Sequence, residues 1–465
     1  MNISLKNLGV LKKAEFTLGD LTIISGKNNT CKTYATYALF GFLESWRQHV
    51  QIPIGDSVIS DLRQDGIATI NLSQYANAAN KILSEACERY SDQLDYVFAA
   101  TEGRFVEGEF YFQIGIPNIQ EQKLEYDLTT HDEYPLFLAK RKGDEEMTVT
   151  LVKKEEEQNE IALEFALLLI RVFIIDLLFS DSFPNPFITS AERTGVTVFR
   201  KELNFARKHL LERMKQANKN IIYRDLLSKA YQNYPQPIEE NADFIGRLED
   251  VAKRKSFITK EHPELLRSFS NIIGGDYSVA PNDQLYFIPK GQRLRLTMVE
   301  SSGAVRSLLD LGVYLRHVAR KGDLLMVDEP ELNLHPENQR RVARIFARLV
   351  NLGIKVFATT HSDYIIKESN TLIMLKHDRP HLKRVAKENG YRNDELISSD
   401  QVKVYMTQMA LMPLEKGQKR RRRGHTLVPA DIDPRFGIEA RSFDETIDDM
   451  NRISEDIVWG AEEGS

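Results

Sequence analysis

The first part of the chain carries apolar and polar residues in the patterns of β-strands and a helix. Residues 1–16 alternate in the manner of strands, and the apolar run at 18–24 predicts another strand. At 34–43 the apolar residues recur three and four positions apart, which is typical of a helix that packs on a core. The N-terminal pattern therefore predicts strands, a connecting loop and a helix, in that order.

The alternation of strands with helices returns toward the C-terminus. Four apolar residues at 324–327 lead into Asp328-Glu329 and predict a buried strand. A helix is predicted at 336–352 and a further strand at 354–360. Strands that alternate with helices are expected to form a largely parallel sheet.

The middle of the chain has a different character. Residues 61–154 mix a helical stretch at 78–90 with a strand-like piece at 104–114. A long helix is predicted at 155–180, and residues 197–272 have an almost wholly helical pattern. This segment is interpreted as an insertion into the α/β core.

The predicted fold class is therefore α/β, with a core made from two remote stretches of sequence. Its parts are a core at 1–60 and 284–375, a mixed α/β part of the same lobe at 61–154, a largely helical insertion at 155–283 and a small α+β C-terminal tail at 376–465.

The loop between the strand at 18–24 and the helix at 34–43 has the sequence of a P-loop. It reads Gly26-Lys27-Asn28-Asn29-Thr30-Cys31-Lys32-Thr33. In such a loop the backbone amides and the helix N-terminus surround the phosphates of a nucleotide, Lys32 reaches the outer phosphates, and the Thr33 hydroxyl binds Mg²⁺. The loop predicts a site for ATP and Mg²⁺.

Cys31 departs from the usual pattern, because the residue directly before the P-loop lysine is normally glycine. A side chain there occupies space where backbone approaches phosphate closely. Three interpretations stand side by side: a slightly altered loop accommodates the small side chain, hydrolysis is slowed, or the helix N-terminus and Lys32 lower the pKa of a redox-sensitive thiol.

The carboxylates at the end of the 324–327 strand complete the predicted site. Asp328 is expected to hold Mg²⁺ through water, and Glu329 to orient or deprotonate the attacking water. His361 follows the strand at 354–360 and is expected to contact the γ-phosphate; the alternative is an unrelated surface histidine. The predicted catalytic residues are thus Lys32, Glu329 and His361, with Thr33 and Asp328 at the metal.

The amino-acid composition indicates the cellular location expected for the protein. The chain has 465 residues, a formal net charge of −5 and two cysteines, Cys31 and Cys87, which is too few for a disulfide framework or a zinc site. A cytoplasmic location is therefore expected. The apolar stretch at 161–179 contains Glu164, Arg171 and Asp176, so it predicts a core helix and no contact with a membrane.

These motifs, in this order, resemble the ABC-type ATPase heads of the SMC, RecF and OLD group over residues 1–45 and 290–370. Ser302-Gly303 aligns with the ABC motif, although Glu-Ser-Ser-Gly-Ala lacks the fuller Leu-Ser-Gly-Gly form, and residues 331–336 align with the D-loop. His361 aligns with the switch histidine. The resemblance implies a homodimer or higher homo-oligomer with composite ATP sites, in which Ser302 and Gly303 touch ATP on the other subunit.

Two assignments in this comparison have plain alternatives. Ser302 also suits the N-cap of a helix that begins near Ala304, and both roles can hold at once. Gln113 is a candidate for a glutamine that senses Mg²⁺; the alternative is ordinary exposure on a strand.

The chain is also similar to the stand-alone ATPases of bacterial anti-phage systems, the Septu-type PtuA proteins that accompany some retrons. The similarity lies in Thr-Ser-Ala-Glu-Arg-Thr-Gly at 189–195 and in the tail at 442–451. It implies a slowly hydrolysing switch that controls a separate nuclease effector. The rival hypothesis is a DNA-repair or chromosome-maintenance ATPase that clamps DNA with its helical lobe.

The tail carries an Asp-x-Asp segment, a basic run and a predicted helix. Asp431-Ile432-Asp433 is followed by a proline and is interpreted as a turn, not as part of a nuclease site. The basic run from Lys419 to Arg423 predicts DNA or RNA contact, an acidic partner protein or a solvated linker. A helix predicted at 443–459 is interpreted as packing on the core or docking on a partner.

Overall fold

The structure is a computed structural model that divides into two compact units. It describes residues 1–115, 118–121, 124–127, 136–151, 156–202, 234–281, 284–413, 421–438 and 451–455. The first unit comprises residues 1–8, 38–95 and 100–185, and the second comprises residues 9–37, 96–99 and 186–465.

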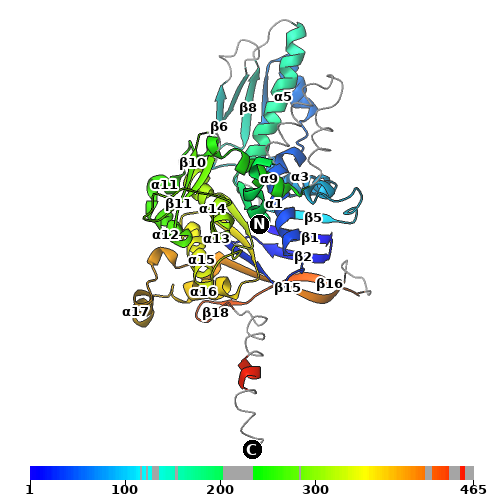
Figure 1. Cartoon of the computed structure of the whole chain (residues 1–465). Helices are drawn as coiled ribbons and strands as arrows, with labels where there is room; N and C mark the ends of the chain where they lie inside the picture. Colours follow the sequence, from blue (N-terminus) through cyan, green and yellow to red (C-terminus); the bar gives the residue numbers. More distant parts are fainter. Residues whose placement is uncertain are drawn as a thin grey trace, which may run out of the picture. The chain divides into compact units, whose positions relative to one another are not determined.

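The first unit contains a four-stranded antiparallel sheet and several helices (Figure 1). The sheet has the order β4 (Ile67–Asn71), β8 (Glu146–Leu151), β7 (Leu136–Lys140) and β6 (Leu124–Asp127). In addition, β1 (Asn2–Leu8) pairs with β5 (Glu109–Gln113) in antiparallel orientation. Helices with residues in this unit include α1 (Lys32–His49), α2 (Asp56–Gln64), α3 (Leu72–Ser91), α4 (Leu94–Val97) and α5 (Glu156–Phe179).

The long helix predicted at 155–180 is present as α5. Its side chains Ala166, Ile170 and Ile174 are buried, as expected for a helix that packs on a core. Among the residues that the structure describes, no helix is both long enough and apolar enough to cross a membrane.

The second unit is built on a sheet whose strands come from both ends of the chain (Figure 1). The order in this unit is β2 (Leu11–Thr17), β16 (Arg421–Pro429), β15 (Val402–Pro413), β3 (Leu21–Ser25), β14 (Lys355–Thr360), β13 (Leu324–Asp328) and β9 (Pro186–Thr189). The strands β15, β3, β14, β13 and β9 are parallel to one another. Their carboxyl ends therefore meet at one edge of the sheet.

The helices of the second unit contribute buried residues to the same apolar core as the sheet. They include α6 (Arg193–Val198), α9 (Gln236–Gly246), α10 (Leu248–Val251), α11 (Phe257–Glu261), α12 (Pro263–Ile273), α13 (Gly303–Ser307), α14 (Leu309–Val313), the π-helix η1 (Tyr314–Val318), α15 (Pro336–Asn351), α16 (Asp363–Met374) and α17 (Pro380–Glu388), with 3₁₀ turns η2 (Asn393–Glu395) and η3 (Ser399–Gln401). Smaller sheets join β10 (Gly275–Ala280), β11 (Gln284–Pro289) and β12 (Leu296–Thr297), and β17 (Ile432–Asp433) with β18 (Gly437–Ile438).

Local sequence signals account for several of these boundaries. The helix α15 begins after His335, with Pro336 in the first turn, where a missing amide proton costs nothing. The helix α12 ends at Gly274, whose φ of 73° is the left-handed conformation that glycine adopts most easily. All five residues of β13 are buried, which explains its continuous apolar run.

The α/β class is confirmed, but the predicted boundaries need correction. The helix α5 belongs to the first unit, whereas β9 joins the sheet of the second, so residues 155–283 are not one insertion. The tail at 376–465 is not separate either, because β15 pairs with β3 inside the sheet. The helix predicted at 443–459 lies outside the described residues except at 451–455.

Candidate functional site

The phosphate-binding loop and the Asp-Glu pair follow neighbouring strands of the second unit's sheet. In the register of the parallel strands, Thr359 of β14 lies opposite Ile24 of β3 on one side and opposite Asp328 of β13 on the other. The Ser25 hydroxyl also donates to the Thr360 carbonyl at 3.1 Å. Two segments about 300 residues apart in sequence therefore end side by side at the carboxyl edge of one sheet.

The loop has the backbone conformation expected of a phosphate cradle. Asn29 and Cys31 have φ values of 60° and 75°, and α1 begins directly afterwards at Lys32. The Lys32 ammonium donates to the carbonyls of Gly26 and Lys27 at 2.9 and 3.0 Å. It therefore lies across the loop.

The electrostatic surroundings of Lys32 connect the loop to the acidic strand end. Burial lowers the pKa of Lys32, and the negative charges of Glu329, Asp328 and Glu331 oppose that shift. Thr33, the predicted Mg²⁺ ligand, is exposed at the start of α1, as are Lys27, Asn28 and Asn29 in the loop. The predicted binding residues are thus assembled around one ammonium group.

Cys31 is buried and occupies a conformation that favours glycine. Its exposed fraction is 5%, and its φ of 75° lies in the left-handed region, at a cost of about 1–3 kcal/mol for a side-chain-bearing residue. Burial raises the pKa of the Cys31 thiol to about 12, although Lys32 acts in the opposite direction. The interpretation of a thiol with a lowered pKa is therefore wrong, because desolvation outweighs the nearby positive charge.

Asp328 ends β13 with a carboxylate that is 2% exposed. One oxygen, Oδ1, accepts a hydrogen bond from the Thr359 hydroxyl, while Oδ2 has no hydrogen-bond partner among the described residues. Burial raises the pKa of Asp328 to about 6, and the Thr359 hydrogen bond opposes this. A buried carboxylate oxygen without a donor fits a site that a hydrated Mg²⁺ ion would complete.

Glu329 lies just beyond the strand in a strained turn. Its φ is 51°, and its amide donates to the Thr359 carbonyl at 3.0 Å. His361 lies nearby, with Nδ1 3.7 Å from Glu329 Oε1. The structure thus brings together the Asp-Glu pair and the predicted histidine.

Glu331 anchors His361, a role that the sequence did not reveal. Its Oε1 accepts from the His361 amide at 2.8 Å and lies 3.3 Å from His361 Nδ1. Its Oε2 accepts from the Thr360 hydroxyl at 2.8 Å. A glutamate that is 7% exposed therefore fixes the backbone at the end of β14 and leaves the His361 side chain 41% exposed.

Ser302 and Gly303 lie at the start of α13. The exposed Ser302 caps this helix, since its hydroxyl accepts from the Val305 amide at 3.3 Å. A Cβ on Gly303 would lie 3.2 Å from Asn333 Cβ, so the Ser-Gly segment packs against the loop after Glu329. The N-cap interpretation is confirmed; a contact with ATP on another subunit stays a prediction.

The segment after β9 supplies residues that sequence reasoning placed only by resemblance. Arg193 is 1% exposed and donates to the carbonyls of both Asp328 and Glu329, at 2.6 and 2.7 Å. Beside it, Glu192 accepts from the Tyr37 hydroxyl at 3.1 Å, and its charge contributes to the raised pKa of Asp328. The sequence signal that could have identified these two residues is the charged pair Glu192-Arg193, which lies shortly after a short apolar strand.

The C-terminal strand β15 also reaches the loop, which the sequence did not predict. The Thr407 hydroxyl donates to the Thr30 hydroxyl at 2.8 Å. A Cβ on Gly26 would lie only 1.7 Å from Thr407 Oγ1, so glycine is required there by the close approach of this strand.

The remaining sequence candidates lie elsewhere. Gln113 is an exposed residue at the end of β5 in the first unit. Asp433 Oδ1 accepts from the amides of Arg435 and Phe436 at 2.7 and 3.0 Å. The interpretation of 431–433 as a turn is wrong, because Ile432–Asp433 form the strand β17 and the turn follows at 434–436. In the basic run, residues 421–423 belong to β16, so the linker interpretation is wrong for them; Lys419 and Arg420 lie outside the described residues.

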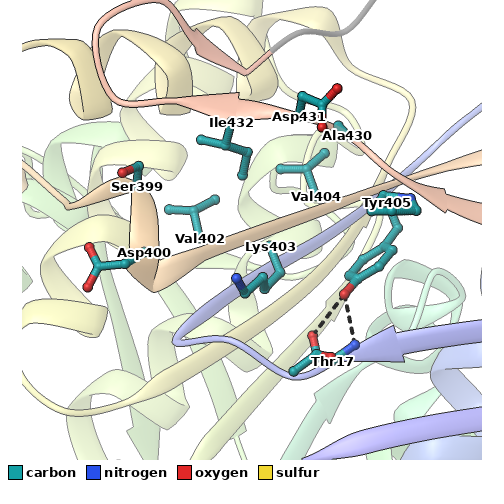
Figure 2. A pocket seen from close by; sticks show the side chains of 11 residues that line it. Thr17, Ser399, Asp400, Val402, Lys403, Val404, Tyr405, Ala430, Asp431 and Ile432 are labelled. Atoms are coloured by element: carbon teal, nitrogen blue, oxygen red, sulfur yellow. Dashed lines mark hydrogen bonds between the residues drawn. The ribbon is translucent and has the colours of Figure 1, made fainter.

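A cavity of about 480 Å³ lies at the start of β15 (Figure 2). It is lined by Val402, Lys403, Tyr405 and Asp431 among others, and the Tyr405 hydroxyl accepts from the Thr17 amide at 2.8 Å. Because Val402 pairs with Leu21 at the first residue of β3, this cavity is at the amino ends of the strands. It is distinct from the phosphate loop, which follows the carboxyl end of β3.

Comparison with known proteins gives a family match over most of the chain. Residues 1–366 match the family described as AAA ATPase domain. No curated protein has a matching sequence.

Solved structures that are similar to this chain include SMC heads. One is an SMC head bound to the C-winged helix domain of ScpA (TM-score 0.34, 11% identity, 92% of this chain and 97% of that one). Others are the SMC head domain from Thermotoga maritima (0.30, 11%, 93% and 98%) and an Smc head with an extended coiled coil, bound to the C-terminal domain of ScpA derived from Pyrococcus furiosus (0.30, 14%, 97% and 98%). TM-scores this low carry no argument about function.

Proposed function

The chain belongs to the AAA ATPase domain family, and we propose that it binds ATP with Mg²⁺ and hydrolyses the nucleotide slowly, as a switch. One observation supports this above the others: the phosphate loop after β3 and the Asp328–Glu329 pair after β13 flank the same strand, β14. Phosphoryl transfer needs positioned positive charge on the phosphates and a carboxylate for the attacking water, and this edge offers both.

In the proposed bound state, the residues of the loop carry the binding. The loop amides and the N-terminus of α1 donate to the phosphates, and Lys32 exchanges its carbonyl contacts within the loop for phosphate oxygens. Thr33 and Asp328 would hold Mg²⁺, which would offset the charge of the phosphates.

Glu329 and His361 then act on the terminal phosphate. Glu329 orients the attacking water and accepts its proton, while His361 contacts the γ-phosphate from the end of β14. Glu331 holds the His361 backbone in place through the 2.8 Å hydrogen bond from its amide. Slow hydrolysis follows from Cys31, whose side chain stands at a glycine position; if Cys31→Gly greatly lowers the rate, this explanation is wrong.

The experiment that tests nucleotide binding is Lys32→Ala. Loss of the ammonium removes the charge that faces the phosphates, so ATP binding measured by calorimetry should become undetectable. Lys403→Ala, at the opposite end of the parallel strands in the same sheet, is the matched control and should bind ATP normally. Unchanged affinity in the Lys32 variant would rule out this loop as the nucleotide site.

We also propose that the ATP-dependent state controls a separate nuclease effector in anti-phage defence, as a homodimer with ATP at composite sites. Support for the effector comes from the sequence similarity at 189–195, and support for the composite site from the exposed Ser302 beside Gly303. The test is to purify this chain with any nuclease that a neighbouring gene encodes and to measure whether ATP changes the activity of that nuclease. Salt-dependent DNA binding by the isolated protein, with no effect on that nuclease, would favour a DNA clamp.

A further inference from the structure

We propose that Arg193 is a positioning residue for ATP hydrolysis, which holds the Asp328–Glu329 turn and the helix α13 in one fixed arrangement. This inference rests on the hydrolysis proposed above and adds the element that links Glu329 to the Ser302–Gly303 segment.

Among the residues that the structure describes, the guanidinium of Arg193 donates hydrogen bonds only to backbone carbonyls. Nε donates to Ser307 O at 2.6 Å, Nη1 donates to Ser190 O at 2.8 Å and to Asp328 O at 2.6 Å, and Nη2 donates to Glu329 O at 2.7 Å. Four carbonyls from three separate segments therefore converge on one side chain: the end of β9, the end of β13 and the last residue of α13.

The planar fork of arginine makes this arrangement rigid. Its N–H groups point in fixed directions within one plane, so the carbonyls that accept from them cannot move independently. Because Arg193 is 1% exposed, water cannot substitute for a lost contact without entering the core. A lysine at this position would keep the charge and lose the fork.

The turn that Arg193 holds is strained at the residue that matters for hydrolysis. Glu329 has a φ of 51°, and such a conformation persists only where the surroundings determine it. Its amide donates to the Thr359 carbonyl at 3.0 Å and its carbonyl accepts from Arg193. Without Arg193, one of these two backbone restraints is lost and the Glu329 carboxylate is no longer aimed.

Nearby carboxylates favour the charged form of Arg193. Asp310 of α14 is 1% exposed, and neither of its carboxylate oxygens has a hydrogen-bond partner among the described residues. Burial lowers the pKa of Arg193, and the charges of Asp310, Asp328, Glu331 and Glu329 oppose that shift. Burial also raises the pKa of Asp310 to about 7, and Arg193 acts against this. The carboxylates thus offset part of the cost of burying the guanidinium.

The consequence is a direct link between the two faces of the proposed composite site. Ser302 caps the N-terminal end of the helix α13, and Ser307 is its last residue. A shift of Ser302 would therefore move the Ser307 carbonyl, which accepts a hydrogen bond from Arg193 Nε. The same fork holds the Glu329 carbonyl. Contact at Ser302 is therefore transmitted to the residue that orients water.

The test is Arg193→Lys in the full chain. ATP binds through the loop, which Arg193 does not touch, so the Kd for ATP should stay within about twofold while kcat falls at least about tenfold through misplacement of Glu329. Arg348→Lys is the matched control, because Arg348 is 2% exposed and its hydrogen bonds go to Ser268 and Glu264, away from the turn. It should lower Tm and leave kcat unchanged.

A second variant tests the same inference if Arg193→Lys does not fold. Arg193→Met with Asp310→Asn removes both buried ionisable groups and keeps similar side-chain volumes. It should also bind ATP with a much lower kcat. A folded variant that hydrolyses ATP at the wild-type rate would overturn the inference, as would a requirement of Arg193 for folding in both variants. If the wild-type protein does not hydrolyse ATP, the proposed function itself fails.

Discussion

At the scale of single residues, the site combines groups that are costly to the fold. Asp328 is buried with one carboxylate oxygen unbonded among the described residues, and Glu329 and Cys31 have φ values of 51° and 75°. Strained backbone conformations and buried ionisable groups are concentrated at functional sites, because the groups that bind a ligand must be held in a fixed geometry. Bound Mg²⁺ would satisfy the Asp328 oxygen that has no hydrogen-bond partner among the described residues.

This cost predicts how Asp328→Asn changes stability with pH. Burial raises the pKa of Asp328 from 3.8 to about 6, so its charge destabilises the folded protein by about 3 kcal/mol above pH 6. That penalty shrinks as pH falls from 6 toward 3.8, because the folded protein takes up the proton first.

The neutral variant escapes this penalty and should lose hydrolysis. Its Tm relative to wild type, measured in EDTA without nucleotide, should rise between pH 5 and pH 8. A Tm difference that stays constant over this range would show that the carboxylate carries no burial cost.

At the scale of elements, the strand β15 is the main addition that the structure makes to the site. It pairs in parallel with β3, which places Met406 opposite Ser25 and Thr407 against the loop. Thr407 donates to Thr30, and Thr30 in turn donates to the Lys27 carbonyl at 2.5 Å. A C-terminal strand therefore supports the loop from the side opposite β14.

The corresponding prediction is Thr407→Val, which keeps the shape and removes the hydroxyl. One lost hydrogen bond is worth about 1 kcal/mol, so the affinity for ATP should fall about threefold to tenfold as the loop loses its support. Thr426→Val on β16, opposite Gln408, is the control and should bind ATP as wild type does. Equal affinity in both variants would show that β15 does not help to order the loop.

At the scale of the whole molecule, the proposed dimer depends on the surface around Ser302 and Gly303. The Ser302 side chain is exposed, and Gly303 packs on Asn333 in the loop that follows Glu329. A nucleotide bound at the loop of one copy would find these groups on the next copy. Dimerisation and hydrolysis would then share the same residues.

Glu329→Gln should therefore accumulate an ATP-bound dimer. The amide keeps the shape of the side chain but cannot accept the proton of the attacking water, so ATP remains at the site. Light scattering should report twice the monomer mass with ATP and the monomer mass without it. Adding Ser302→Arg should abolish the dimer while ATP still binds. If the Glu329→Gln single variant stays monomeric with saturating ATP, the composite site is contradicted.

The sequence by itself determined the α/β class and the residues of the phosphate loop and the acidic strand end. Those signals are local: a buried strand is continuously apolar, and a P-loop needs its residues consecutively, so Lys32, Thr33, Asp328 and Glu329 stand out without a structure. The tertiary structure alone decided the roles of Arg193, Glu331 and Thr407, because each acts through contacts with segments remote in sequence. It also placed β15 in the sheet and reversed the expected pKa shift of Cys31, since burial is a property of the folded chain and cannot be read from neighbouring residues.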